Sequence, residues 1–115
     1  GGWRLYKKSG STELAFYHPS GNYTTSGAGL TNGTWYHIAV VRNGSTLTTY
    51  VDGTSKGTDT ISAAMSPTSA DLEIGQGVYS FPLPYQGYLD DLRITKGVAR
   101  YTANFTPPTS AFPDS

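Results

Sequence analysis

The chain has 115 residues, a length that fits one ordinary domain around one hydrophobic core. Eight basic residues balance eight acidic residues, so no basic stripe is available to neutralise a run of nucleic-acid phosphates. Cysteine is absent, which excludes disulfide frameworks, cysteine-ligated zinc and thiol nucleophiles. The balanced charge predicts no nucleic-acid binding. No apolar run reaches the length of a membrane span, so we expect no membrane insertion either.

The composition favours β-sheet and turns over helices. Glycine and tyrosine are abundant, only 14% of the residues are charged, and glycine, proline or β-branched residues interrupt most windows of helical length. Short alternating runs closed by turn residues predict strands at residues 3–8, 13–18 and 23–25. In the first run, one face carries Trp3, Leu5 and Lys7 and the other carries Arg4, Tyr6 and Lys8.

The strongest pattern is a β-hairpin formed by residues 34–42 and 46–53. Asn43-Gly44 lies between the two runs, and this dipeptide accepts the positive φ angles of a tight hairpin turn. Alternation then puts two apolar sets on matching faces. They are Tyr36, Ile38 and Val40 on one strand and Leu47, Thr49 and Val51 on the next. We expect Trp3 and Trp35 in the core.

The second half of the chain predicts further strands joined by a proline-containing loop. Residues 54–60 return from the hairpin, and residues 72–75 form a short strand with Leu72 and Ile74 pointing inward. Residues 78–85 form a rigid aromatic loop, because proline cannot donate to a β-ladder. Residues 87–94 are the last strand. The tail at 97–115 contains three prolines, so we expect an extended strap rather than a packed element.

Four motifs in this order carry a family resemblance. They are Trp35-Tyr36-His37-Ile38-Ala39-Val40-Val41, Tyr50-Val51-Asp52-Gly53, Leu72-Glu73-Ile74-Gly75 and Gly87-Tyr88-Leu89-Asp90-Asp91-Leu92-Arg93-Ile94. Together they resemble the laminin-G-like, concanavalin A-like jelly-roll superfamily. The resemblance implies an all-β, two-sheet antiparallel jelly-roll sandwich, which we expect as a single domain over 1–115. Residues 95–108 resemble an ending found in phage tail, virion-associated and bacterial surface proteins, which implies an extracellular, cell-surface or virion location.

Domains of this superfamily usually begin with strands upstream of the segment that matches residues 2–6, and these strands lie beside the final ones. A fold that lacks these N-terminal strands exposes a sheet edge at residues 89–94. One interpretation is that a strand-donating partner chain or a homo-oligomer completes the edge. The other is that the chain is a fragment, or that a shorter variant closes on itself.

Acidic pairs are candidate catalytic groups, because the superfamily includes glycoside hydrolases, which need two carboxyl groups across a cleft. Asp71 and Glu73 share a strand face, but the three-acid motif of laminarinase-type relatives is absent. Asp90 and Asp91 are adjacent on a strand and therefore point to opposite faces. Asp91 shares its face with Arg93, so we expect a structural role for Asp91 and Arg93. We expect a structural role for Trp35 as well. We expect no catalytic residues, and a glycoside hydrolase is the least favoured alternative.

No motif indicates a cofactor. Calcium requires several oxygen ligands, and the weak candidates Asp52 and Asp90 would serve only if the fold brings them together. The spacing of His18 and His37 does not indicate a metal site, and His37 is expected to make packing or cross-strand contacts.

Aromatic residues are the remaining functional signal, because sugars stack on aromatic rings while neighbouring polar groups bind the hydroxyls. The expected ligand-binding set has a loop cluster, a second aromatic group and two polar partners: Tyr79, Phe81 and Tyr85; Tyr17 and Tyr23; Gln76 and Asn22. The same rings could instead pack the end of the sandwich or an interface. The sequence therefore predicts a non-catalytic binding or adhesion module that recognises a glycan or cell-surface polysaccharide. The alternative is a structural assembly subunit that makes protein–protein contacts.

Overall fold

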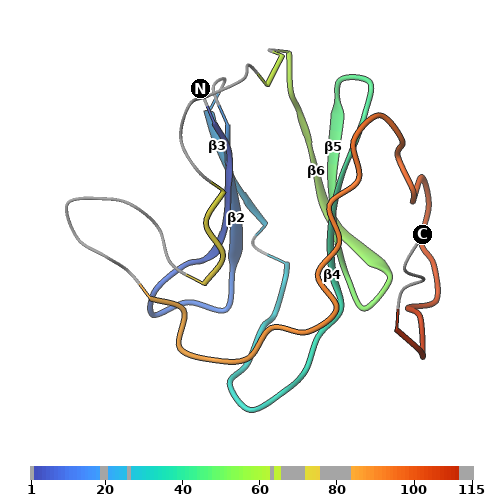
Figure 1. Ribbon diagram of the computed structural model, residues 1–115. Helices are drawn as coiled ribbons and strands as arrows, with labels where there is room; N and C mark the ends of the chain where they lie inside the picture. Colours follow the sequence, from blue (N-terminus) through green and yellow to red (C-terminus); the bar gives the residue numbers. More distant parts are fainter. Residues whose placement is uncertain are drawn as a thin grey trace.

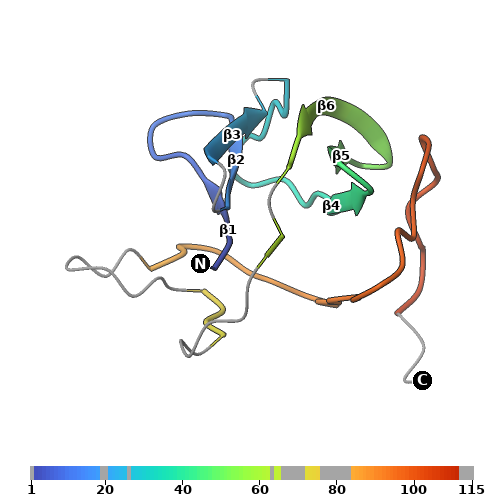
Figure 2. The ribbon, with the colours of Figure 1, turned by 90° about the horizontal axis from the view of Figure 1, so that it is seen from above.

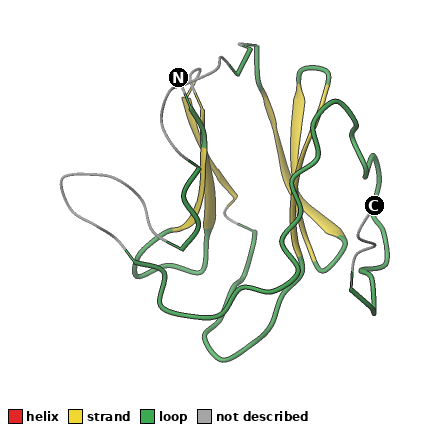
Figure 3. Cartoon of the chain, in the orientation of Figure 1, coloured by secondary structure: helices red, strands yellow, loops and turns green. Residues whose placement is uncertain are grey.

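The computed structural model describes residues 2–18, 21–25, 27–62, 64–65, 72–75 and 84–111, with the backbone alone at 22–25. These residues form two three-stranded antiparallel sheets (Figures 1 and 3). In the described part of the chain, no helix is long and apolar enough to cross a membrane. The strands are β1 (Arg4–Lys7), β2 (Leu14–His18), β3 (Gly21–Thr25), β4 (Ile38–Asn43), β5 (Thr46–Val51) and β6 (Thr54–Thr60).

The first sheet has the order β1-β2-β3 and follows the alternation predicted from the sequence. Leu5 lies opposite Phe16, and Arg4 lies opposite Tyr17. Because successive residues of a strand point to opposite faces, Phe16 and Arg4 belong to different faces of this sheet. The Phe16 face turns toward the second sheet, so the Arg4 face is the outer one.

The second sheet has the order β4-β5-β6 and is built from two tight hairpins. The expected β4–β5 turn is displaced by one residue: Asn43 still pairs with Thr46, and Gly44 at φ 62° is the first loop residue. Asp52 and Gly53 join β5 to β6, and both have positive φ, as a type I′ hairpin turn requires. The first turn fixes the β4–β5 register, and the second fixes the β5–β6 register as far as Tyr50↔Ser55, beyond which an irregularity shifts the pairing by one residue.

The core lies between the two sheets in two adjoining clusters. One cluster contains Leu14, Ala28, Leu30 and Val51, and the other contains Phe16, Leu47 and Ile61. Ile38 packs against the first cluster and Val40 against the second. The predicted pairing of the β4 and β5 faces is therefore confirmed.

The C-terminal strap packs on the outer face of the second sheet, on the side away from the first sheet (Figures 1 and 2). Tyr50 points to this side and is only 3% exposed. Phe105 covers it with a ring-centroid distance of 5.3 Å, and Tyr101 stacks on Phe105 at 3.6 Å. The Phe105 N–H also donates to the Gly53 carbonyl at 2.8 Å. The expectation of an unpacked strap is thus wrong, because Tyr101 and Phe105, which precede its prolines, anchor it to the sheet.

Two predicted strands are not formed. Residues 72–75 and the described residues 84–95 have no assigned strand, and Leu72 and Ile74 are exposed rather than inward. In 87–94, Asp91 has φ 54°, which interrupts an extended backbone. Alternation creates a strand only when a neighbour supplies the hydrogen bonds, and no described strand lies beside either segment.

The sequence prediction that both tryptophans lie in the core is also wrong. Trp35 is 67% exposed and Trp3 is 42% exposed. Trp35 precedes β4, so the alternation of that strand does not fix its direction, and its ring lies 6.4 Å from that of Tyr88. Trp3 precedes β1 and covers one ring face by stacking on Phe16 at 5.8 Å.

Burial predicts which large side chain the fold requires. Ile61 is fully buried, so Ile61→Ala should lower the free energy of unfolding by about 2 to 5 kcal/mol. Trp35→Ala removes a mostly exposed ring and should change it by less than about 1 kcal/mol. Urea denaturation of the two variants measures both values. A larger loss for Trp35→Ala than for Ile61→Ala would contradict this packing.

A second prediction concerns Gly53, where the strap approaches closely. A Cβ atom there would lie 1.8 Å from the Phe105 carbonyl oxygen, and the φ of 81° is itself unfavourable for alanine. Strain and overpacking together should cost roughly 2 to 5 kcal/mol in Gly53→Ala. Gly44→Ala is the matched control, because Gly44 also has positive φ but no atom near its Cβ position, so it should lose only about 1 to 2 kcal/mol. Equal losses in thermal or urea unfolding would show that the strap does not press on Gly53.

Candidate functional site

The outer face of the first sheet carries a cluster of one basic and two aromatic side chains. The Arg4 guanidinium carbon lies 4.8 Å from the ring centroid of Tyr17 and 5.7 Å from that of Tyr6. Arg4 and Tyr17 are cross-strand neighbours, and Tyr6 follows Arg4 by two residues on the same face. We call Arg4, Tyr6 and Tyr17 the aromatic face. Tyr17 remains 39% exposed, so ring surface is still accessible beside the guanidinium.

The residues expected to bind a ligand are only partly brought together. Asn22 is the register partner of Tyr17, which places its backbone beside the aromatic face. Tyr23 is instead the register partner of Phe16, so Tyr17 and Tyr23 occupy alternating positions. Tyr85 is exposed, and its N–H donates to the Gly75 carbonyl at 2.7 Å. The remaining expected residues, Tyr79, Phe81 and Gln76, lie outside the described residues.

Arg4 and Tyr6 were not among the expected site residues. The signal that could have identified them was present, because alternation in residues 3–8 puts both on one face. What the sequence did not specify was the pairing of that face with Tyr17, which depends on the β1–β2 register.

A polar groove of about 740 Å³ lies at the end of the sandwich where the β1–β2 turn meets the loop before β4. Its lining is rich in hydroxyl, amide and charged groups and contains no aromatic ring: Lys7, Gly10, Ser11, Thr12, Glu13, Leu30, Thr31 and Asn32. The groove offers hydrogen bonds but no stacking surface.

Hydrogen bonds around this groove shift two ionisable groups. Lys8 forms an ion pair with Glu13 at 3.0 Å, and the hydrogen bond from Lys8 lowers the pKa of the Glu13 carboxyl, with a smaller contribution from Ser11. The Tyr36 hydroxyl lies 2.9 Å from the Thr31 hydroxyl and accepts a hydrogen bond from the Thr31 N–H at 3.0 Å. These contacts, that with the Thr31 side chain first, lower the pKa of Tyr36.

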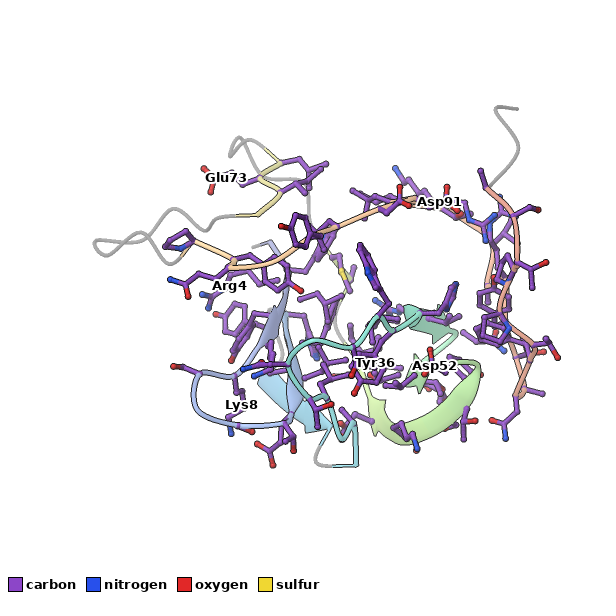
Figure 4. The ribbon with its side chains drawn as sticks, turned by 90° about the horizontal axis from the view of Figure 1, so that it is seen from below. Arg4, Lys8, Tyr36, Asp52, Glu73 and Asp91 are labelled. Atoms are coloured by element: carbon purple, nitrogen blue, oxygen red, sulfur yellow. The ribbon has the colours of Figure 1, made fainter. Side chains whose placement is uncertain are left out.

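The acidic residues do not form the arrangement expected of a glycoside hydrolase in the described part of the chain. Asp71 lies outside the described residues, and Glu73 is exposed and lies far from Asp91 (Figure 4). Asp90 and Asp91 depart from the prediction: both line one groove of about 300 Å³ with residues 108–111 of the strap. They share it because the positive φ of Asp91 breaks the strand alternation that would have separated them.

The two weak metal candidates, Asp52 and Asp90, have different surroundings: Asp90 lines the groove beside the strap, whereas Asp52 makes hydrogen bonds at a turn. The Asp52 carboxylate accepts a hydrogen bond from the His37 N–H at 2.8 Å, and the Asp52 N–H donates to the His37 carbonyl at 2.8 Å. Asp52 is therefore a turn residue that ties the start of β4 to the end of β5. The His37 ring packs edge-on against Phe105 at 5.5 Å, which confirms its predicted packing role. Among the described residues, no group of three or more potential metal ligands occurs.

A second exposed surface is apolar. We call it the apolar segment surface, and it comprises Trp35, Tyr88, Leu89, Leu92 and Ile94. All five side chains are more than half exposed, with Tyr88 at 82%. The segment that carries four of them runs past both sheets along one side of the sandwich (Figure 2). Arg93, between Leu92 and Ile94, donates to the Tyr101 hydroxyl at 3.3 Å, which ties this segment to the strap.

Two three-stranded antiparallel sheets packed face to face around a shared core form a small β-sandwich. The sequence profile of the concanavalin A-like lectin/glucanases superfamily matches residues 1–100, so the chain belongs to this superfamily and the resemblance found in its motifs is confirmed. The superfamily implies a jelly-roll sandwich and includes both lectins and glucanases. Searches of curated proteins and of solved structures gave no match.

The Lys8–Glu13 pair makes a testable electrostatic prediction. Replacing Lys8 by Met removes the main cause of the lowered pKa of Glu13, so that pKa should rise toward its ordinary value in an NMR titration. Because the folded pKa is depressed, the stability from this pair is present above the unfolded pKa and is lost as pH falls through the folded pKa. The unfolding curves of wild type and Lys8→Met should therefore converge in acid. Lys56→Met, an exposed lysine on β6, is the control, and an equal shift of Glu13 in both variants would contradict the assignment.

Proposed function

We propose that this protein is a non-catalytic carbohydrate-binding or adhesion module that binds its glycan on the aromatic face. The single observation that carries the proposal is the cross-strand cluster of Arg4, Tyr6 and Tyr17 on an outer sheet face of a superfamily that includes lectins. Tyr17 is 39% exposed and Tyr6 is half-buried, so the cluster presents ring surface beside a guanidinium, a combination suited to contact with a ligand.

The chemistry of the aromatic face suits a sugar. The apolar side of a pyranose ring packs against exposed tyrosine surface, while the guanidinium of Arg4 supplies several N–H donors in a fixed plane for sugar hydroxyl or carboxylate oxygens. The ring contacts of Arg4 hold this plane in place before binding, which lowers the entropy cost of fixing the side chain.

No catalytic step is included in the proposal. Glycoside hydrolysis requires two carboxyl groups roughly 5 to 9.5 Å apart across a sugar-binding cleft, and no carboxyl group belongs to the aromatic face. Polysaccharides of the kind an adhesion module recognises lie outside cells. We therefore propose an extracellular, cell-surface or virion location, as on a tail appendage or a bacterial surface protein.

Substitution of Tyr17 tests the glycan proposal. Tyr17→Ala should weaken retention on the recognised polysaccharide at least tenfold, about 1.4 kcal/mol, while the unfolding midpoint stays nearly unchanged, because Tyr17 is partly exposed. Affinity electrophoresis in a panel of neutral and acidic polysaccharides measures retention. Tyr88→Ala, which removes an exposed ring that packs near Trp35 and is not part of the aromatic face, is the control and should retain full binding.

A site at the expected loop cluster would give a different result from a site on the aromatic face. Retention lost in Tyr85→Ala but kept in Tyr17→Ala would move the site to that loop, and no retention of wild type on any polysaccharide would overturn the proposal.

The apolar segment surface supports a second candidate function, a structural subunit that assembles through protein–protein contacts. Its five exposed apolar side chains lie on or near one segment, and exposed apolar surface gathered in one region is typical of a contact site. A charge introduced by Leu89→Asp or Leu92→Asp should dissociate such an assembly. Light scattering over a concentration series measures the mass, and a monomer at every concentration for wild type would exclude this candidate.

A further inference from the structure

Residues 87–94 combine exposed apolar side chains with a backbone that belongs to neither described sheet. Within the described residues, Tyr88, Leu89, Leu92 and Ile94 take part in no backbone–backbone hydrogen bond, although the segment alternates as a strand does. Exposed backbone donors and acceptors beside apolar side chains form a template for strand addition. The segment is therefore suited to pairing with another extended chain.

Charge order within the segment selects the partner. In an antiparallel pair, residues that lie directly opposite each other point to the same face. When a two-fold axis relates two identical strands, this requires one residue to lie opposite its own copy, at the centre of the pairing. Centres at Asp90 or Asp91 put a carboxylate opposite its own copy. The centre at Leu92 instead sets Leu92 against Leu92 and places Asp91 of each copy opposite Arg93 of the other. This is the register in which the segment is complementary to itself.

We propose that two copies of this protein associate through residues 87–94, as antiparallel strands centred on Leu92. The proposal rests on the second candidate function and names its partner as a second copy of the same chain. Pairing would draw Asp91 out of the left-handed region, where its φ is 54°, into an extended conformation that non-glycine residues prefer. Tyr88 and Trp35, whose rings lie 6.4 Å apart, flank the paired strands and would be covered at the rim.

Charge reversal tests the register. Wild type should sediment near 24.6 kDa, twice its chain mass of 12.3 kDa, in analytical ultracentrifugation. Asp91→Lys puts an ammonium group opposite Arg93, and Arg93→Glu puts two carboxyl groups opposite each other, so each single variant should raise the dissociation constant at least tenfold. An equimolar mixture of the two variants restores opposite charges and should form a heterodimer, and the double variant should again form a homodimer. Circular dichroism of each variant controls for folding, which matters because Arg93 also contacts Tyr101.

The outcomes separate this proposal from the one on which it rests. A monomeric wild type overturns both the dimer and the assembly function. A dimer that persists in both single variants, or a mixture of dissociated variants that does not associate, overturns the Leu92-centred register and leaves assembly to another surface. A dimer lost in each variant and recovered in their mixture supports the register, since an effect confined to one folded chain could not be rescued by a second chain.

Discussion

Burial of strand β5 on both faces is the constraint on which the rest of this structure depends. Its inner face carries Leu47 and Val51 into the two core clusters, and its outer face presents Tyr50 to the strap. β4 and β6 occupy its two hydrogen-bonding edges. A strand covered on four sides leaves little freedom in register, which the two tight turns that flank it and the irregularity at Thr49/Tyr50 together set.

This arrangement decides which surfaces remain for function. The inner faces of both sheets are used in the core and the outer face of the second sheet is covered by Tyr101 and Phe105, so the first sheet keeps the exposed outer face. Arg4, Tyr6 and Tyr17 lie on that face. The crossing segment, residues 87–94, runs past both sheets (Figure 2) and carries four of the five residues of the apolar segment surface. A glycan and a second copy of the chain would therefore meet different parts of the molecule, and binding of one need not exclude the other.

The sequence predicted those strands whose partners are close in the chain. Asn43-Gly44 and Asp52-Gly53 mark the hairpins of the second sheet, and alternation identified its inward residues correctly. Residues 87–94 have equally good alternation but no neighbouring strand in the described part of the chain, and periodicity carries no information about whether a partner is present. The prediction that Trp35 is buried was wrong for a related reason. Aromatic character indicates a preference for burial, but it does not show that another surface is available to cover the ring.

The candidate site was predictable only in part. Tyr17 and Asn22 were predicted as ligand-binding residues from residue type, and the β2–β3 register places them opposite each other. Arg4 and Tyr6 required knowledge of how β1 pairs with β2, which no local motif specifies. The contact of the strap with Gly53 was likewise hidden, because it joins residues 52 positions apart, Gly53 and Phe105, through a single hydrogen bond and the absence of a Cβ atom.

The most direct test of the functional account is an NMR titration of the isotopically labelled protein with oligosaccharides from the polysaccharide that retains it. The account predicts that amide and side-chain shifts change first at Arg4, Tyr6 and Tyr17, with little change at Leu89–Ile94. Shift changes confined to the crossing segment, or spread over the polar groove at Ser11–Glu13 without the aromatic face, would contradict it.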